Sequence, residues 1–201
     1  MERNLNAAKE AMERSDRQSK AAIDASIEAS RNDQRAWLTF SRFLLSEEPT
    51  ADKEVAIDYW IINTGKTPAI DMYTQGTVWI LPSEMIFPFG ELADHPKIVV
   101  PPNAPNMSTR LKWKFAASFL TNYPTKVYRL YFNGLVLYHD IFGELRWTSV
   151  CAWHEYGESL DHFSFCSKGN ETDKDQRQSE STPAFIPTTT TRKKKRTGLS
   201  I

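Results

Sequence analysis

The sequence lacks the short motifs on which most enzyme assignments rest. Its eight glycines form no GxxxxGK(S/T) phosphate-binding loop, no GxGxxG dinucleotide fingerprint and no GxSxG nucleophile turn. Gly65-Lys66-Thr67 matches the end of a phosphate-binding loop, but the first glycine is missing and Pro68 prevents a helix from continuing there. The sequence therefore indicates no enzyme class and favours a non-catalytic role.

Cysteines and long apolar runs are also scarce. The two cysteines, Cys151 and Cys166, make no disulfide framework and no CxxC zinc pattern. On neighbouring antiparallel strands they could be bridged in an oxidising compartment, whereas a cytoplasm predicts two reduced, partly buried thiols. No apolar run approaches the roughly 18 residues of a membrane span, and the start does not match a signal peptide. As written, the sequence predicts a cytoplasmic protein with reduced thiols.

Aromatic residues are almost missing from the two ends of the chain. None lies in 1–35, and 23 of the 24 lie in 36–166. Because aromatic side chains dominate core burial, we expect one globular domain over 36–166. A helical segment over 1–35 precedes it and a disordered basic tail over 167–201 follows. The domain carries ten basic and fourteen acidic residues, so specific binding of nucleic acid is not expected.

A long helix is predicted from Leu5 to about Gln34. This stretch has no Gly or Pro and is rich in Ala, Glu, Lys, Arg and Gln. Two heptad seam positions hold mostly small residues, namely Leu5, Met12, Ser19 and Ser26 at one and Ala8, Ser15, Ala22 and Ala29 at the other. Small residues bury little area, so a strong coiled coil is not expected. Three interpretations stay open: a solvated and partly frayed helix, a stalk for weak self-association, or a spacer.

Eight strand-like segments rich in β-branched and aromatic residues follow. They are predicted at 37–44, 53–62, 69–80, 98–100, 108–118, 126–139, 145–153 and 160–166. The sixth is expected to bend or bulge at Asn133-Gly134. Short strands punctuated by Pro and Gly, with a meander at the end, predict a mainly β fold: an Ig-like antiparallel β-sandwich preceded by one long α-helix.

A turn at Asn63-Thr64-Gly65-Lys66-Thr67-Pro68-Ala69 separates the second and third of these segments. Asn63 can bond its own backbone, Gly65 can take positive φ, and Pro68 fixes φ while ending ladder donation. The turn therefore predicts a connector that ends one strand and directs the next, as in an antiparallel β-sandwich.

Several segments together resemble a large set of uncharacterised bacterial proteins. These segments are Asp33-Gln34-Arg35-Ala36-Trp37, the turn above, the corner Tyr138-His139-Asp140-Ile141-Phe142-Gly143, and a closing Phe165-Cys166 strand. The resemblance covers about residues 20–173. It implies a polar helix that usually follows one or two membrane-spanning helices, and no assigned activity. Here Met1 opens directly on the polar helix, so one expectation is a start codon placed downstream of an anchor, which would make the protein inner-membrane-associated.

The residues expected to matter most are structural and carry no catalytic role. They lie at the turns and corners named above, at Trp37, Asn63, Gly65, Pro68, Tyr138, Asp140 and Gly143. The main hypothesis is an accessory or protein-interaction module without a cofactor, with weak self-association through the helix.

Two other hypotheses depend on polar and aromatic residues in the domain. A metal-dependent hydrolase would need convergent ligands, for which the candidates are His139, Asp140, His154 and His162. A ligand-binding sandwich would use surface aromatics such as Trp79 or Trp153. In the tail, the basic run Arg192, Lys193, Lys194, Lys195 and Arg196 is a candidate contact for anionic lipid.

Overall fold

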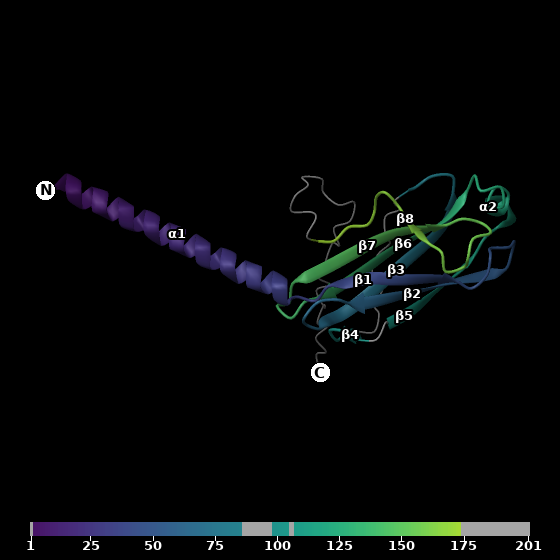
Figure 1. Ribbon diagram of the computed structural model, residues 1–201, viewed down its shortest axis with the longest axis horizontal. Helices are drawn as coiled ribbons and strands as arrows, with labels where there is room; N and C mark the ends of the chain where they lie inside the picture. Colours follow the sequence, from purple (N-terminus) through teal and green to yellow (C-terminus); the bar gives the residue numbers. More distant parts are fainter. Residues whose placement is uncertain (1, 86–97, 105–106, 174–201) are drawn as a thin grey trace, which may run out of the picture.

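A long helix and two antiparallel sheets make up the chain in a computed structural model. The structure describes residues 2–85, 98–104 and 107–173, without the side chains of residues 2–8. The helix α1 spans Glu2–Gln34, which at 1.5 Å per residue is roughly 50 Å. It projects away from the sheets (Figure 1), and every side chain from Lys9 to Arg31 is exposed.

The sheets contain three and five strands. The first has the order β1-β2-β5, with β1 at Leu38–Leu45, β2 at Glu54–Asn63 and β5 at Met107–Lys114. The second has the order β4-β3-β6-β7-β8, with these strands at Ile98–Val100, Ala69–Leu81, Arg129–His139, Leu145–His154 and Ser164–Phe165. All pairings are antiparallel. The predicted mainly β fold behind one long helix is confirmed.

The two sheets pack face to face around Phe132. Its ring lies 5.2 Å from that of Phe43 on β1 and 5.0 Å from that of Tyr59 on β2. Tyr59 also donates a hydrogen bond across the core to Thr74 on β3, at 3.2 Å. Gly134 leaves room for these rings, because a Cβ there would meet the side chain of Phe132 at 2.7 Å. The aromatic residues concentrated in 36–166 thus form the sandwich core.

The irregularities in the sheets differ from the prediction. Strand β6 pairs without interruption through Asn133 and Gly134 on both sides, so the expected bend or bulge there is wrong. Register shifts occur instead in β1 between Phe40 and Arg42 and in β3 around Asp71, whose φ is 52°. The physical reason is that Gly134 serves core packing and leaves the ladder intact. A short helix, α2 (Ala117–Leu120), occupies the end of the predicted fifth strand.

The segment 167–173 is ordered, which corrects the predicted start of the disordered tail at 167. The chain returns along β7, where Thr172 bridges Thr148 and Ser149 N donates to Glu171 O at 2.8 Å. Asp173 N donates to Trp147 O at 3.2 Å. These hydrogen bonds join residues far apart in the sequence, so composition alone could not show that the ordered chain continues to residue 173. The remainder of the predicted tail, including its basic run at 192–196, lies outside the described residues.

Candidate functional site

The end of α1 is joined to the sandwich by a buried group of charged side chains. Arg35, only 2% exposed, donates Nη1–H to Asp173 Oδ2 at 3.1 Å and Nη2–H to Asp173 Oδ1 at 2.6 Å. Its guanidinium also lies over the ring of Trp37, 3.6 Å from the centroid. Arg146 donates to Asp173 at 3.0 Å and to Asp140 at 2.9 Å. Two arginines and two aspartates therefore alternate, and their formal charges cancel.

The predicted turn closes over this charged group. Asn63 uses its whole amide: Oδ1 accepts from Trp37 N and Gly65 N, and Nδ2 donates to Thr67 O and Val100 O. These four bonds, between 2.8 and 3.1 Å, tie three separate parts of the chain together. Asn63 is therefore a cross-link as well as a turn residue.

Gly65 is needed here for close approach and does not have the expected positive φ. Glycines with positive φ in the described residues are Gly143, Gly157 and Gly169. At Gly65 a Cβ would lie 2.3 Å from Arg35 O and 2.6 Å from Trp37 N, both backbone atoms that cannot swing aside. The turn is pressed directly against the chain leaving α1.

The Tyr138–Gly143 corner completes this end of the molecule. The hydroxyl of Tyr138 donates to Ala36 O at 3.0 Å. Asp140 is 1% exposed, and its Oδ1 accepts from Phe142 N and Glu144 N at 3.0 Å each. Gly143, with φ of 80°, closes the turn. The guanidinium of Arg31 in the last turn of α1 lies over the Phe142 ring, 5.4 Å from its centroid.

The structure thus brings most of the predicted structural residues to one place. We call this group the junction: Trp37, Asn63, Gly65, Tyr138, Asp140 and Gly143, together with Arg35, Arg146 and Asp173. Pro68 precedes β3 in the same turn. Sequence reasoning missed Arg35, Arg146 and Asp173 because their pairing spans up to 138 residues. No local sequence pattern predicts such long-range contacts.

The metal candidates do not converge. His139 pairs with Leu145 beside the hairpin turn, whereas His154 pairs with Leu130 at the far end of the same hairpin. Nine residue steps along β7 separate these positions, or roughly 30 Å at 3.4 Å per residue. The expectation that the two histidines could meet is therefore wrong. Asp140 is engaged by Arg146, and within the described part of the chain no three His, Cys, Asp or Glu side chains gather as metal ligands.

His154 belongs to a second buried polar group, at the end of the sandwich opposite α1. Its side chain is inaccessible, and Nδ1 donates to the backbone carbonyl of His162 at 3.0 Å. Its Nε2 faces Glu48 Oε1 at 3.2 Å, so that contact requires a further proton on either the imidazole or the carboxyl. Gly157 N donates to Oε1 at 2.9 Å, and Tyr123 donates to Oε2 at 3.0 Å. We call Glu48, Tyr123, His154 and Gly157 the distal cluster.

The two cysteines are joined by a disulfide. Their Cα atoms are 5.3 Å apart, and Cys166 N donates to Cys151 O at 2.9 Å. Asn170 holds the same loop, because its Oδ1 accepts from Cys151 N and its Nδ2 donates to Cys166 O. Cys151 lies on β7 and Cys166 directly follows the neighbouring strand β8, so the predicted proximity is confirmed and the expectation of two reduced thiols is wrong.

The tryptophans proposed for ligand binding lie in one row across the five-stranded sheet. Trp79 and Trp153 both pair with Tyr131. Both are half-buried: Trp79 lies 6.4 Å from Trp113 by ring centroids, and the Arg129 guanidinium covers Trp153 at 4.0 Å. Their faces are therefore occupied by protein groups, which weakens the case for an open aromatic platform.

Comparison of the sequence with protein-family models and with curated proteins finds no match. The resemblance to bacterial proteins stays a prediction. Among the described residues no helix is both long and apolar enough to cross a membrane. What the geometry offers is a sandwich joined to α1 through the hydrogen bonds and ion pairs of the junction.

Proposed function

We propose that the protein is a non-catalytic interaction module that presents its sandwich on α1 as a rigid spacer. The observation that carries this proposal is the contrast at Arg35. Arg35 is 2% exposed and is held by Asp173, by Trp37 and by Lys66 N, which donates to Arg35 O at 3.3 Å, while every side chain from Lys9 to Arg31 is exposed. A helix whose direction is fixed at one end supports a role in holding the sandwich at a distance from whatever is bound at the other end of α1.

We further propose that the sandwich is Ig-like. The order β1-β2-β5 in one sheet and β3-β6-β7 in the other corresponds to strands A-B-E and C-F-G of that fold. Ig-like sandwiches host many unrelated activities, so the fold alone supports no particular partner.

We also propose that α1 self-associates weakly with a second copy. Met12 is 68% exposed and Ile23 is 59% exposed. They lie eleven residues apart, which keeps them on one line of a helix with 3.67 residues per turn. Between Ala11 and Ser30 the same face carries no charge, being formed by Ala11, Met12, Ser15, Gln18, Ser19, Ala22, Ile23, Ala25, Ser26, Ala29 and Ser30. An uncharged face with exposed large apolar side chains favours pairing of helices.

Sedimentation equilibrium of the full chain tests this self-association. The wild type is expected to show reversible dimerisation, and Ile23→Lys is expected to shift it to monomer because the lysine would place a charge in the interface. Ala21→Lys adds the same charge on the opposite side of α1 and serves as the matched control. A wild type that stays monomeric at its highest soluble concentration would refute self-association through α1.

The disulfide motivates a proposal about location. We propose that the sandwich matures in an oxidising compartment, in place of the cytoplasm expected from the sequence, because structural disulfides persist mainly in such compartments. Alkylation of the protein in its native cells, followed by mass determination, is expected to find Cys151 and Cys166 protected. Full alkylation of both thiols before reduction would contradict the proposal.

A disulfide that closes a loop of this length also contributes to stability. The two cysteines are 15 residues apart, for which the chain-entropy model gives about 3 kcal/mol. Reduction, or the variant Cys151→Ala with Cys166→Ala, is therefore expected to lower the free energy of unfolding by about that amount, measured by urea denaturation. Equal urea midpoints for oxidised and reduced protein would show that the bond has no stabilising role.

A further inference from the structure

The outer edge of β1 is an open strand edge. Trp37 O accepts from Thr64 N and Ser46 N donates to Ala56 O, both at 2.8 Å, so these residues form hydrogen-bonded pairs beside β2. Pairs alternate along an antiparallel ladder. Together with the register shift between Phe40 and Arg42, this places the N–H and C=O groups of Leu38, Phe40, Phe43 and Leu45 on the side away from β2.

Among the described residues, other segments hydrogen-bond to this edge at its two ends. Thr148 Oγ1 donates to Leu38 O at 2.9 Å, and Leu45 N donates to Leu160 O at 2.8 Å. The outward groups of Phe40 and Phe43 have no hydrogen-bond partner among the described residues. The middle of β1 therefore keeps main-chain donors and acceptors at Phe40 and Phe43, on either side of the register shift at Ser41.

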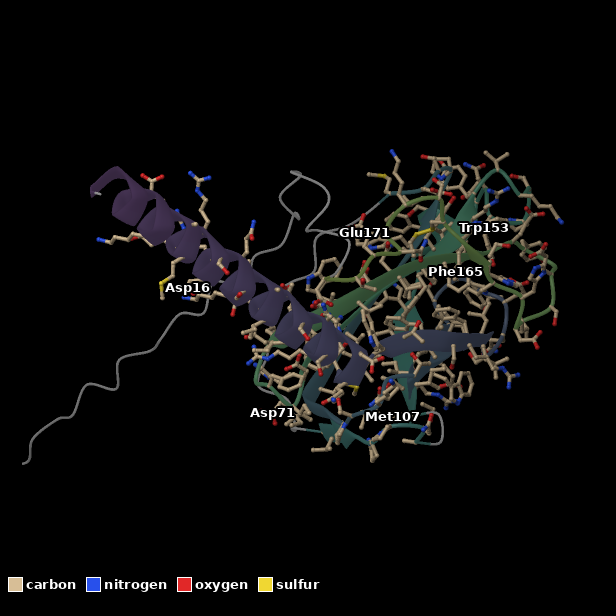
Figure 2. All side chains as sticks on the ribbon, turned by 60° about the vertical axis from the view of Figure 1, so that its left-hand side comes forward. Asp16, Asp71, Met107, Trp153, Phe165 and Glu171 are labelled. Carbon is tan, nitrogen blue, oxygen red and sulfur yellow. A yellow bond between two sulfur atoms is a disulfide. The ribbon has the colours of Figure 1, made fainter. Side chains whose placement is uncertain are left out.

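A pocket of about 270 Å³ lies directly beside this edge. Its apolar lining includes Phe40, Val150 and Phe165, and its polar rim includes Thr39, Asn170 and Glu171. The Phe165 ring is 61% exposed and meets the Phe43 ring edge-on at 6.4 Å. Figure 2 shows Phe165 and Glu171 along the same side of the sandwich.

We propose that β1 binds an extended segment of a partner polypeptide as an added strand. The unpaired main-chain groups of Phe40 and Phe43 would bind its backbone, as in strand addition to an exposed sheet edge. An apolar side chain of the segment enters the pocket against Phe165. A basic side chain faces Glu171, whose carboxylate has no cationic partner among the described residues. The partner is thus an extended, apolar and basic segment.

Pairing of β1 with its counterpart in a second copy is disfavoured by the strand itself. Arg42 lies near the middle of β1, so a two-fold axis there would bring two guanidinium groups together. This repulsion favours a different polypeptide as the occupant.

This proposal deepens the interaction role proposed above, and selection of peptides tests it. A phage library of random heptapeptides is selected against the full chain, and the selected peptide is synthesised and titrated by fluorescence polarisation. We expect Phe165→Ser to weaken binding by at least about tenfold, as for loss of an aromatic anchor. Phe119→Ser removes another exposed aromatic, 54% exposed on α2, and is expected to leave the affinity unchanged.

Backbone methylation of the selected peptide tests the strand mode itself. N-methyl groups at one alternating set of residues should abolish binding, whereas the other set, facing away from β1, should be tolerated. Glu171→Lys should exchange the preference for basic peptides for acidic ones. Failure to select any peptide, equal binding by Phe165→Ser, or tolerance of both methylated sets would overturn the proposal. Sedimentation of Ile23→Lys stays a separate readout, so failure here is distinguishable from failure of the interaction role through α1.

Discussion

The two ends of the sandwich each close on a buried tyrosine, with charges of both signs near Tyr138 and carboxylates near Tyr123. At the junction the Tyr138 hydroxyl donates to Ala36 O at 3.0 Å. At the distal cluster the Tyr123 hydroxyl donates to Glu48 Oε2, also at 3.0 Å. Burial raises the pKa of both hydroxyls. Nearby Arg35 counteracts the rise at Tyr138, whereas the Glu48 carboxylate adds to the rise at Tyr123.

The difference between the two ends indicates which changes each end can tolerate without losing stability. The junction balances two guanidinium groups against two carboxylates, and arginine keeps its charge across the accessible pH range. The distal cluster instead surrounds Glu48 with the Tyr123 hydroxyl, the Gly157 N–H and Nε2 of His154. We expect the junction to respond most to loss of a side chain and the distal cluster most to loss of a proton.

The largest expected effect is at the junction. Arg35→Ala leaves a nearly buried carboxylate at Asp173 with one of its two cations missing, which should lower the free energy of unfolding by about 3–5 kcal/mol. Lys66→Ala removes the exposed ion pair with Asp33 at the same end and should cost less than about 1 kcal/mol. Equal losses for the two variants in urea denaturation would show that the buried pair has no special weight.

A smaller loss is expected from Gly65→Ala. The added Cβ meets backbone atoms of Arg35 and Trp37, so the turn must move, at about 1–3 kcal/mol. Gly143→Ala is the comparison, because a Cβ there meets nothing within 4 Å and only the positive φ is strained. It should cost about 1 kcal/mol. Thermal unfolding would contradict the close-approach explanation if Gly65→Ala were the milder change.

At the distal cluster the expected effect depends on pH. The folded state keeps the Tyr123 proton at pH values where the unfolded chain loses it, so the free energy of unfolding falls as pH rises above about 10. Tyr123→Phe should cost about 1 kcal/mol at neutral pH, since Glu48 loses a donor, and should remove the part of this alkaline loss that Tyr123 contributes. Tyr138→Phe should remove less of it. Identical alkaline profiles for the two variants would remove the distinction between the ends.

The smallest expected effect lies between the two ends, on β2 and β5. Arg110 donates to both Asp58 oxygens, at 2.7 and 2.6 Å, and this hydrogen bonding lowers the pKa of Asp58. The contribution of this ion pair to the free energy of unfolding is therefore present above the ordinary carboxyl pKa near 4. It is lost as pH falls through the lowered pKa of Asp58. Asp58→Asn should cost under about 1 kcal/mol at neutral pH. Urea denaturation at acidic and neutral pH should find the cost smaller in acid, and a larger cost in acid would contradict this.

Strand positions were largely predictable because β-branched and aromatic residues favour strands locally. Segment 53–62 was predicted as a strand from its β-branched and aromatic residues, and β2 is Glu54–Asn63. The helix was equally plain, since a stretch without Gly or Pro leaves no local reason to stop before Gln34. Such features depend on neighbours within a few residues, which a sequence displays directly.

Only part of the junction was predictable, because several of its contacts join residues that are far apart in the sequence. Asn63 and Asp140 stand at turns, where residue type signals the local conformation. Arg35 was assigned to the helix and Asp173 to a disordered tail, and nothing near either residue indicates that they meet. Gly65 was identified correctly as a special position, but for positive φ instead of for the backbone pressed against it. Tertiary contacts, which leave no local pattern in the sequence, determine the partners of Arg35 and Asp173 and the role of Gly65.

The most direct test of a rigidly mounted helix is a distance distribution between α1 and the sandwich. Spin labels at Ser19→Cys and Ser108→Cys, both exposed sites, are measured by double electron–electron resonance with the labelled chain diluted in unlabelled chain. The native cysteines are bonded to each other and take no label. The junction predicts one narrow distance peak. A broad distribution, as expected for a helix on a free hinge, would contradict the account.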